Sequence, residues 1–212
     1  MTDLAADKPK AINFNLDFDG TATPVKTALF LLVLLCWLLP GLVGHDPWKP
    51  QEGQTIGVIY SMIKSGDWLV PMLAGEPYLE RPPLYYWTAA VFVKAFSPLL
   101  PMHDAARLAT GFYMVLAILL VTLTAAKLFG PRFGRVTALI FIGSFGLLAT
   151  AHMLTADTVM LAAVALLIYG LASLPGQVLV AGLCIGSGIG IAFLAKGSTA
   201  AALAFAMVAT PF

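Results

Sequence analysis

The sequence predicts an all-α, polytopic membrane protein with about six transmembrane helices. Of its 212 residues, 59% are hydrophobic and only 11% are charged, and the mean hydropathy is +0.88. Residues 136–212 carry only Asp157 and Lys196 as formal charges, a density that a surface facing water does not tolerate. The 12 basic and 11 acidic residues nearly balance. No basic field is therefore present to hold a nucleic acid, and that class of partner is excluded.

The N-terminal part predicts a tail followed by a first transmembrane helix. Residues 1–25 show no sustained hydrophobic period, so we expect a cytoplasmic tail. The apolar run from Ala28 to Val43 predicts the first transmembrane helix at 26–43. An uncleaved anchor is favoured over a cleaved signal peptide, because the preceding tail is long and acidic and no small-x-small cleavage site follows.

Five more apolar segments in the region 104–212 predict the remaining transmembrane helices. Their expected ranges are 104–127, 136–151, 156–172, 178–195 and 197–212. The last segment runs to Phe212 with no polar residues after it, so we expect the chain to be truncated relative to a longer protein.

The connector that precedes residue 136 predicts the orientation. It contains Lys127, Arg132 and Arg135 and no acidic residue. The positive-inside rule places it, and the N-terminus two crossings earlier, in the cytoplasm. Alternation then places the loop 44–103, the turn at 152–157 and Lys196 on the outer face.

The outer loop at 44–103 is expected to contain two amphipathic helices that lie on the membrane. For the first helix, Pro50 suits the first helical position, Ser65-Gly66 supplies the end, and the spacing between them predicts one apolar stripe. That stripe comprises Ile56, Ile59, Tyr60 and Ile63.

The second amphipathic helix is expected after a turn rich in proline and glycine at 67–83. It runs from Leu84 to Phe96. Its Tyr85, Tyr86 and Trp87 suit the headgroup zone of a bilayer. The outer face would then have a helical floor.

Two carboxylates in this loop are candidate catalytic bases. Glu52 stands at the start of the first expected helix, where the helix dipole keeps a carboxylate ionised and able to accept a proton from a hydroxyl. The alternative is that Glu52 only complements the helix dipole, which is the commoner use of such a residue. Asp46 is a second candidate base, or else a turn residue in Gly44-His45-Asp46-Pro47.

Arg81 and Lys196 are candidate ligands for an anion. Two prolines hold Arg81 away from helical dihedrals, and the next helix presents unpaired N–H groups beside its guanidinium. Pairing with Glu80 or with lipid headgroups explains Arg81 equally well. Lys196 lies between two apolar runs and marks either an interfacial anchor or a site that faces a polar cavity. Asp157 is explained most simply as a residue that caps the fourth span.

The three histidines predict at most a metal site on the outer face. His45, His103 and His152 all map there, and with Glu80 they are candidate ligands of a divalent metal, the only cofactor that the sequence suggests. Their spacing matches no metal motif. Polar residues also gather at the ends of spans in any membrane protein.

Four short motifs occur in order along the chain: Pro47-Trp48-Lys49-Pro50-Gln51-Glu52, Ser65-Gly66-Asp67-Trp68-Leu69-Val70-Pro71, Tyr78-Leu79-Glu80-Arg81-Pro82-Pro83-Leu84-Tyr85-Tyr86-Trp87 and Gly190-Ile191-Ala192-Phe193-Leu194-Ala195-Lys196-Gly197. Together they resemble the N-terminal part of a GT-C glycosyltransferase. The similarity is to bacterial lipid A aminoarabinose transferases and to protein O-mannosyltransferase-like enzymes. It implies a polyprenyl-phosphate sugar donor and an active site on the periplasmic side of the bacterial inner membrane. It also implies further spans and a soluble outer domain beyond this chain.

The resemblance assigns roles to individual positions. It implies that Arg81 stands where the family has a phosphate-binding lysine, and that Lys196 matches the Lys-Gly of a later span. Asp157 matches a second functional acidic position. At Gln51 the sequence departs from the family, whose Pro-Asp-Glu motif supplies the proposed catalytic base; a glutamine amide cannot act as a base, so Glu52 or Asp46 would have to replace it.

We therefore expect a membrane glycosyltransferase that modifies a hydroxyl of a lipid, a glycan or a protein, as in lipopolysaccharide modification. A carboxylate would deprotonate the acceptor, while Arg81 and Lys196 stabilise the charge on the departing lipid phosphate. Two alternatives stay open: a catalytically impaired relative that only binds lipid-linked sugar, and a transporter or structural membrane subunit. A transporter would place ionisable groups near the bilayer midplane, whereas these charges lie at the ends of spans. The expected partners are the sugar donor, the acceptor and membrane lipids.

Overall fold

The structure is a computed structural model that describes residues 24–209. The tail expected at 1–25 lies almost wholly outside the described residues, as does the end of the expected last span. In chain order the elements are α1 (Pro24–Leu38), α2 (Gln51–Ser65), β1 (Met72–Leu73), β2 (Glu76–Pro77), α3 (Leu84–Phe96), α4 (Met102–Phe129), α5 (Pro131–Ile142), α6 (Phe145–Thr150), α7 (Asp157–Ser173), α8 (Val178–Lys196) and α9 (Ser198–Ala209). The expected all-α architecture therefore holds apart from one short hairpin.

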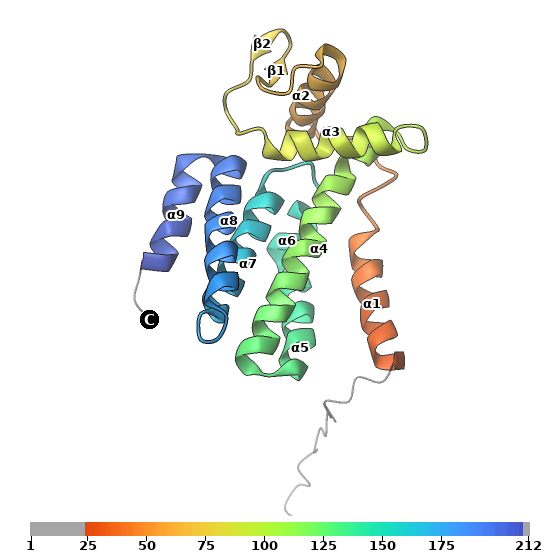
Figure 1. The fold of residues 1–212 in the computed structure, drawn as a ribbon. Helices are drawn as coiled ribbons and strands as arrows, with labels where there is room; N and C mark the ends of the chain where they lie inside the picture. Colours follow the sequence, from red (N-terminus) through yellow and green to blue (C-terminus); the bar gives the residue numbers. More distant parts are fainter. Residues whose placement is uncertain (1–23, 210–212) are drawn as a thin grey trace, which may run out of the picture.

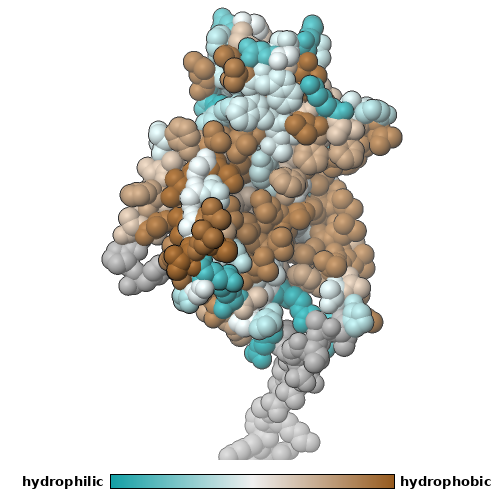
Figure 2. All heavy atoms as spheres, viewed as in Figure 1, coloured by the Kyte–Doolittle hydropathy of each residue, from teal (hydrophilic) through white to brown (hydrophobic). Residues whose placement is uncertain are grey.

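The helices form two parts that meet at one end of the molecule. Helices α1 and α4 to α9 stand side by side, and α2, the hairpin and α3 cover one end of this bundle (Figure 1). On the face that Figure 2 shows, an apolar band covers the middle of the bundle, and polar residues gather at both of its ends. Among the described helices, α4 and α8 are long and apolar enough to cross a membrane; α1, α7 and α9 are apolar but shorter.

Helix α1 ends earlier than the apolar run predicts. The expected span reached Val43, but the helix ends at Leu38. Pro40 disfavours helical dihedrals at the residue before it, and Gly41 then takes a positive φ of 93°, which turns the chain away from the helix axis. Hydrophobicity alone thus overestimated the length of this helix.

The single span expected at 136–151 is divided into α5 and α6. Gly143 and Ser144 separate them, and both residue types have poor helix propensity. The Ser144 hydroxyl donates to the carbonyl of Ile140 at 3.3 Å, while the Ser144 backbone is extended at φ −68° and ψ 122°. The extended backbone at Ser144 therefore separates α5 from α6.

Helix α2 begins and ends close to the predicted residues, but its buried face only partly overlaps the predicted stripe. Gly66 ends it in a left-handed conformation, with its N–H donating to the Met62 carbonyl. Tyr60, which the predicted stripe included, is 53% exposed. The buried face comprises Glu52, Thr55, Val58, Ile59 and Met62. Because the first two residues of this face, Glu52 and Thr55, are polar, a hydrophobicity pattern does not predict that the face is buried.

Helix α3 has the predicted bounds, whereas its tyrosines do not lie in a headgroup zone. Tyr85 and Tyr86 are 1% and 2% exposed, and the Tyr85 hydroxyl shares a hydrogen bond of 2.7 Å with Thr110 of α4. These rings belong to the main core, which joins α2, α3, α4 and the start of α7. The core thus fixes the outer elements to the bundle.

The turn expected at 67–83 contains an antiparallel hairpin. Met72 pairs with Pro77 and Leu73 pairs with Glu76. Ala74 and Gly75 connect the strands with φ of 54° and 91°, the two positive values that a tight two-residue hairpin turn requires. Four strand residues are too few for an alternating pattern to reveal them.

Candidate functional site

A small polar pocket lies where the outer elements meet the bundle. Its volume is about 140 Å³, and its walls come from α2, from the segment between the hairpin and α3, and from the loop that precedes α7. The lining residues are Gln51, Gln54, Thr55, Tyr78, Glu80, Arg81, Tyr86, Met153, Leu154 and Thr155. Segments separated by about a hundred positions in the sequence therefore build one site.

Arg81 brings a positive charge to this pocket, and a second one lies nearby. Lys196 forms an ion pair with Asp157, each side chain being a little over two-fifths exposed. Arg81 interacts electrostatically with the same aspartate. Gly197 lies against Pro82, because a Cβ added there would be 3.9 Å from its ring. The structure thus brings together the three charged residues that the sequence singled out separately.

Asp157 is the first residue of α7, but it does not cap this helix through its side chain. Its Oδ2 accepts a hydrogen bond of 3.0 Å from the Thr155 hydroxyl, and its Oδ1 faces Lys196. Thr155 also lines the pocket. The expectation of a simple helix cap is therefore wrong, since the carboxylate holds the lysine and the pocket wall.

Tyr86 and Glu80 complete the polar lining. Burial raises the pKa of the Tyr86 phenol, and the neighbouring Tyr78 raises it further, so Tyr86 keeps its proton and is available as a hydrogen-bond donor. The Tyr78 hydroxyl donates to Glu80 Oε2 at 3.2 Å. The lining thus combines the Arg81 guanidinium with neutral tyrosine hydroxyls and the Glu80 carboxylate. The guanidinium is the part of this lining that suits an anion.

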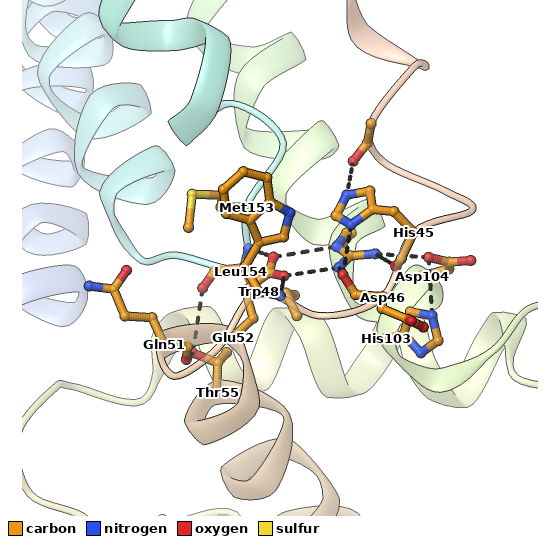
Figure 3. A network of polar contacts seen from close by, with 12 residues as sticks. His45, Asp46, Trp48, Gln51, Glu52, Thr55, His103, Asp104, Met153 and Leu154 are labelled. Atoms are coloured by element: carbon orange, nitrogen blue, oxygen red, sulfur yellow. Dashed lines mark hydrogen bonds and ion pairs between the residues drawn. The ribbon is translucent and has the colours of Figure 1, made fainter.

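Glu52 lies beside the pocket and is fully buried. Its Oε1 accepts hydrogen bonds from the backbone N–H of Leu154 at 2.7 Å and from Arg107 Nε at 3.4 Å. Its Oε2 accepts from the N–H of Trp48 at 2.7 Å and from Arg107 Nη2 at 2.9 Å. Figure 3 shows this network, with the Gln51 side chain pointing away from it.

Arg107 is a buried charged residue at this site that the sequence analysis did not single out. It is the largest fully buried side chain of the described residues. It also pairs with Asp104 at 3.0 Å. The signal was present in the sequence, because an arginine three positions after an aspartate inside a predicted transmembrane helix marks a paired, inward-facing site. We call Arg107, Glu52 and Asp104 the Arg107 cluster.

Asp46 does not line the polar pocket. Its side chain is exposed, and its backbone carbonyl accepts from Arg107 Nη2 at 3.4 Å and lies 2.9 Å from His45 Nδ1. The structure thus engages Asp46 through its backbone.

The candidate metal ligands are not gathered at one point. His45 Nε2 contacts the carbonyl of Gly41 at 2.8 Å, His152 bridges the carbonyls of Leu148 and Trp37, and His103 lies 3.6 Å from Asp104. Within residues 24–209, no three His, Cys, Asp or Glu side chains come together as a metal site. The structure therefore does not support the expectation that these histidines and Glu80 bind a divalent metal.

Two larger cavities open on the bundle. One of about 560 Å³ lies between α1 and α4 and is almost wholly apolar. Another of about 680 Å³ is lined by residues that include Trp37, Trp48 and His152. Met153 lines both this cavity and the polar pocket. The smaller pocket contains Arg81, which interacts with Asp157 of the ion pair with Lys196. We therefore take it as the candidate site.

Comparison with known proteins connects this arrangement to membrane glycosyltransferases. The chain is 35% identical over 140 residues to the undecaprenyl phosphate-alpha-4-amino-4-deoxy-L-arabinose arabinosyl transferase 2 of Pseudomonas fluorescens, covering 64% of this chain and 23% of that protein. It is 36% identical over 123 residues to a transferase of the same name from Pseudomonas savastanoi pv. phaseolicola, covering 57% of this chain and 22% of the relative.

The fold is similar to solved structures of ArnT from Cupriavidus metallidurans. The structure bound to undecaprenyl phosphate matches with a TM-score of 0.71 at 26% identity, covering 86% of this chain and 34% of that one. The apo structure matches with a TM-score of 0.69 over 84% of this chain. The chain thus spans about a third of the solved structures and under a quarter of the two curated relatives.

The family comparison matches the part of the chain that contains Arg81, Arg107, Asp157 and Lys196. Residues 80–212 match the dolichyl-phosphate-mannose-protein mannosyltransferase family. Because this region is more than half of the chain, the protein belongs to the dolichyl-phosphate-mannose-protein mannosyltransferase family.

Proposed function

We propose that this chain forms part of a membrane glycosyltransferase that takes a sugar from a polyprenyl-phosphate donor and transfers it to a hydroxyl of a lipid or a glycan. The observation that carries this proposal is that Arg81, which lines the polar pocket, interacts with Asp157, which forms an ion pair with Lys196. The relatives named above are transferases that use an undecaprenyl phosphate-linked aminoarabinose. That class of donor is therefore the first to test.

In this proposal the lipid phosphate lies beside Arg81. A guanidinium offers two parallel donors to a phosphate, and Lys196 adds a second positive charge close by. Charge develops on the phosphate as the sugar leaves, so these fixed cations stabilise the transition state more than the ground state. Asp157 keeps the Lys196 ammonium in place when no phosphate is bound.

This mechanism needs a general base for the acceptor hydroxyl, but Gln51 lies in the pocket wall at the position where the family motif has an aspartate. Glu52 is fully buried with both oxygens engaged, and Asp46 is not a lining residue. We therefore propose that neither replaces the missing aspartate. The remaining carboxylates at the site are Glu80, in the pocket lining, and Asp157 beside it.

The Gln51 amide also favours a second candidate function: binding of a lipid-linked sugar without transfer. Gln51→Asp distinguishes the two. Loss of a general base costs about two to four powers of ten in rate, so this substitution should raise transfer strongly if the protein only binds. If Glu80 or Asp157 already serves as the base, Gln51→Asp should change transfer little and Glu80→Gln or Asp157→Asn should abolish it. Unchanged transfer in all three variants would contradict a carboxylate base at this pocket.

We propose that α1, α4, α5 with α6, α7, α8 and α9 form six membrane crossings. The first crossing would then be α1, Pro24–Leu38, with α2 and α3 lying along the outer surface between α1 and α4. The N-terminus would be cytoplasmic and the polar pocket would face the periplasm of a bacterial cell. The apolar band on the bundle supports this arrangement (Figure 2).

The experiment that tests the donor site measures undecaprenyl phosphate binding to the purified chain in lipid nanodiscs. Arg81→Ala should weaken binding by about 10- to 100-fold, because a charge-assisted hydrogen bond contributes about 1.5–3 kcal/mol. Lys196→Ala should weaken binding in the same direction. Arg132→Ala, which removes an exposed arginine at the far end of the bundle, is the control. Normal binding by Arg81→Ala would reduce this residue to an interfacial anchor.

A further inference from the structure

Arg107 is a fully buried cation whose charge and hydrogen-bond donors are satisfied by neighbouring groups. The side chain lies in the second turn of α4 and is 0% exposed. A buried guanidinium costs several kcal/mol unless its charge is balanced and its donors are satisfied. Glu52 and Asp104 balance the charge at 2.9 Å and 3.0 Å. The carbonyls of His45 and Asp46 accept at 2.8 Å and 3.4 Å.

These partners come from separate parts of the chain. Glu52 belongs to the first turn of α2, and its oxygens also accept from the N–H groups of Trp48 and Leu154. Asp104 Oδ2 accepts from the N–H of Gly44 at 3.1 Å. The segment 44–48, the start of α2 and the loop before α7 therefore converge on one residue of α4.

The connections made through Glu52 reach the wall of the polar pocket, because Leu154 lines it and Glu52 follows the lining residue Gln51. Glu52 does not line the pocket, but Gln51 does. Leu154 is followed by Thr155, whose hydroxyl donates to Asp157. The Thr55 hydroxyl adds a second bridge between the same two walls, because it reaches the Leu154 carbonyl at 3.4 Å.

We propose that Arg107 is the positioning residue of the polar pocket. It holds the α2 wall and the loop before α7 at a fixed separation through Glu52. It does not touch the proposed ligand, and its effect on binding is exerted through the backbone that carries Gln51 and Thr155. This inference rests on the proposed function only for the identity of the ligand.

The test reads wall spacing and ligand binding separately, in the full 212-residue chain. Gln54→Cys and Met153→Cys, made together in a Cys36→Ala, Cys184→Ala background, place one thiol on each wall of the pocket. A short bifunctional thiol reagent then reports whether the walls keep their spacing. Affinity for undecaprenyl phosphate is measured per folded molecule in nanodiscs, without the added cysteines.

Arg107→Gln should lower the cross-linking yield and weaken undecaprenyl phosphate binding at least tenfold, since a small misplacement of a site costs up to about 100-fold. Arg107→Lys should recover part of both losses, because it keeps the charge and loses the fork of donors. Glu52→Gln keeps the Arg107–Asp104 pair, so this variant replaces Arg107→Gln in the test if Arg107→Gln does not fold. Arg132→Gln is the matched control.

The outcomes separate this proposal from the proposed function. If Arg107→Gln and Glu52→Gln cross-link like the wild type, or if the folded fraction of each binds undecaprenyl phosphate normally, Arg107 has no positioning role. If the wild-type chain binds no undecaprenyl phosphate while cross-linking still depends on Arg107, the proposed function fails and the positioning role stands.

Discussion

Glu52 shows how this fold keeps a buried carboxylate ionised. Burial by itself raises the pKa of the Glu52 carboxyl. The hydrogen bonds from Arg107, from the Trp48 N–H and from the Leu154 N–H lower it more, so the pKa lies below its ordinary value of 4.5. The lowered pKa means that the ionised form is bound more strongly in the folded state than in the unfolded state.

This lowered pKa predicts how stability depends on pH. The contribution of Glu52 is fully present above pH 4.5, the ordinary value, and it is lost as the pH falls through the lower pKa of the folded state. Thermal unfolding in detergent should therefore show wild-type stability declining below about pH 4.5. Glu52→Gln should be less stable at neutral pH by about 3–5 kcal/mol, the cost of breaking a buried pair, and its decline should be shallower.

Glu76→Gln is the control for this pH profile, because Glu76 is an exposed acid of the hairpin. It should retain the wild-type decline. Parallel curves for Glu52→Gln and the wild type would contradict the assignment of the acid sensitivity to the Arg107 cluster.

At the residue scale the sequence predicted the members of the site better than their roles. Arg81 and Lys196 were singled out from local context and Asp157 through the resemblance, and the structure brings the three together. The use of Glu52 could not be derived, because it depends on Arg107, which is 55 positions away in the sequence. Helix-start chemistry predicts an ionised carboxylate but not the partner that buries it.

At the element scale, the close packing of α7 and α8 depends on small residues. These two helices form the most extensive contact among the described elements. A Cβ added at Gly188 would lie 3.1 Å from the Ala163 carbonyl oxygen and 3.2 Å from the Leu167 Cβ. Gly188 is buried, as is Ala192 one turn later. Small residues at this spacing allow two helix backbones to approach closely in a membrane.

Gly188→Leu should therefore destabilise the protein by about 1–3 kcal/mol, the usual cost of overpacking. Gly186→Leu is the matched control, because a Cβ at Gly186 meets nothing within 4 Å. Both variants gain helix propensity equally, so the difference between their thermal unfolding midpoints measures the packing alone. Equal midpoints would show that α7 and α8 are free to separate without cost.

Helix bounds were predicted well where polar or helix-ending residues mark them, and poorly elsewhere. Residues 84–96 were expected and α3 has those bounds. The division between α5 and α6 was missed, because Gly143 and Ser144 are tolerated inside apolar segments and only the extended backbone at Ser144 reveals the break. A hydropathy average over a whole span does not detect a break at one or two residues.

At the scale of the whole molecule, the bundle separates two polar ends. The hairpin, α2 and α3 cover one end, while α4 and α5 are joined at the other (Figure 1). The polar pocket and the Arg107 cluster belong to the first end, because α2 contributes residues to both. Lys127, near the end of α4, donates to Ser173 of α7 at 2.8 Å, which ties the connectors at that end together. The cations expected in the cytoplasm and the candidate site therefore stand at opposite ends, as alternating crossings require.

This separation predicts opposite accessibility for the two ends in intact cells. In a Cys36→Ala, Cys184→Ala background, Glu76→Cys should react with a membrane-impermeant thiol reagent added from outside, because Glu76 is exposed in the hairpin. Arg132→Cys should react only after the cells are permeabilised, since the positive-inside rule places its connector in the cytoplasm. Both positions are exposed, so a difference in labelling reports the side of the membrane. The reverse pattern would place Arg81, Lys196 and the pocket in the cytoplasm and contradict a periplasmic glycosyltransferase.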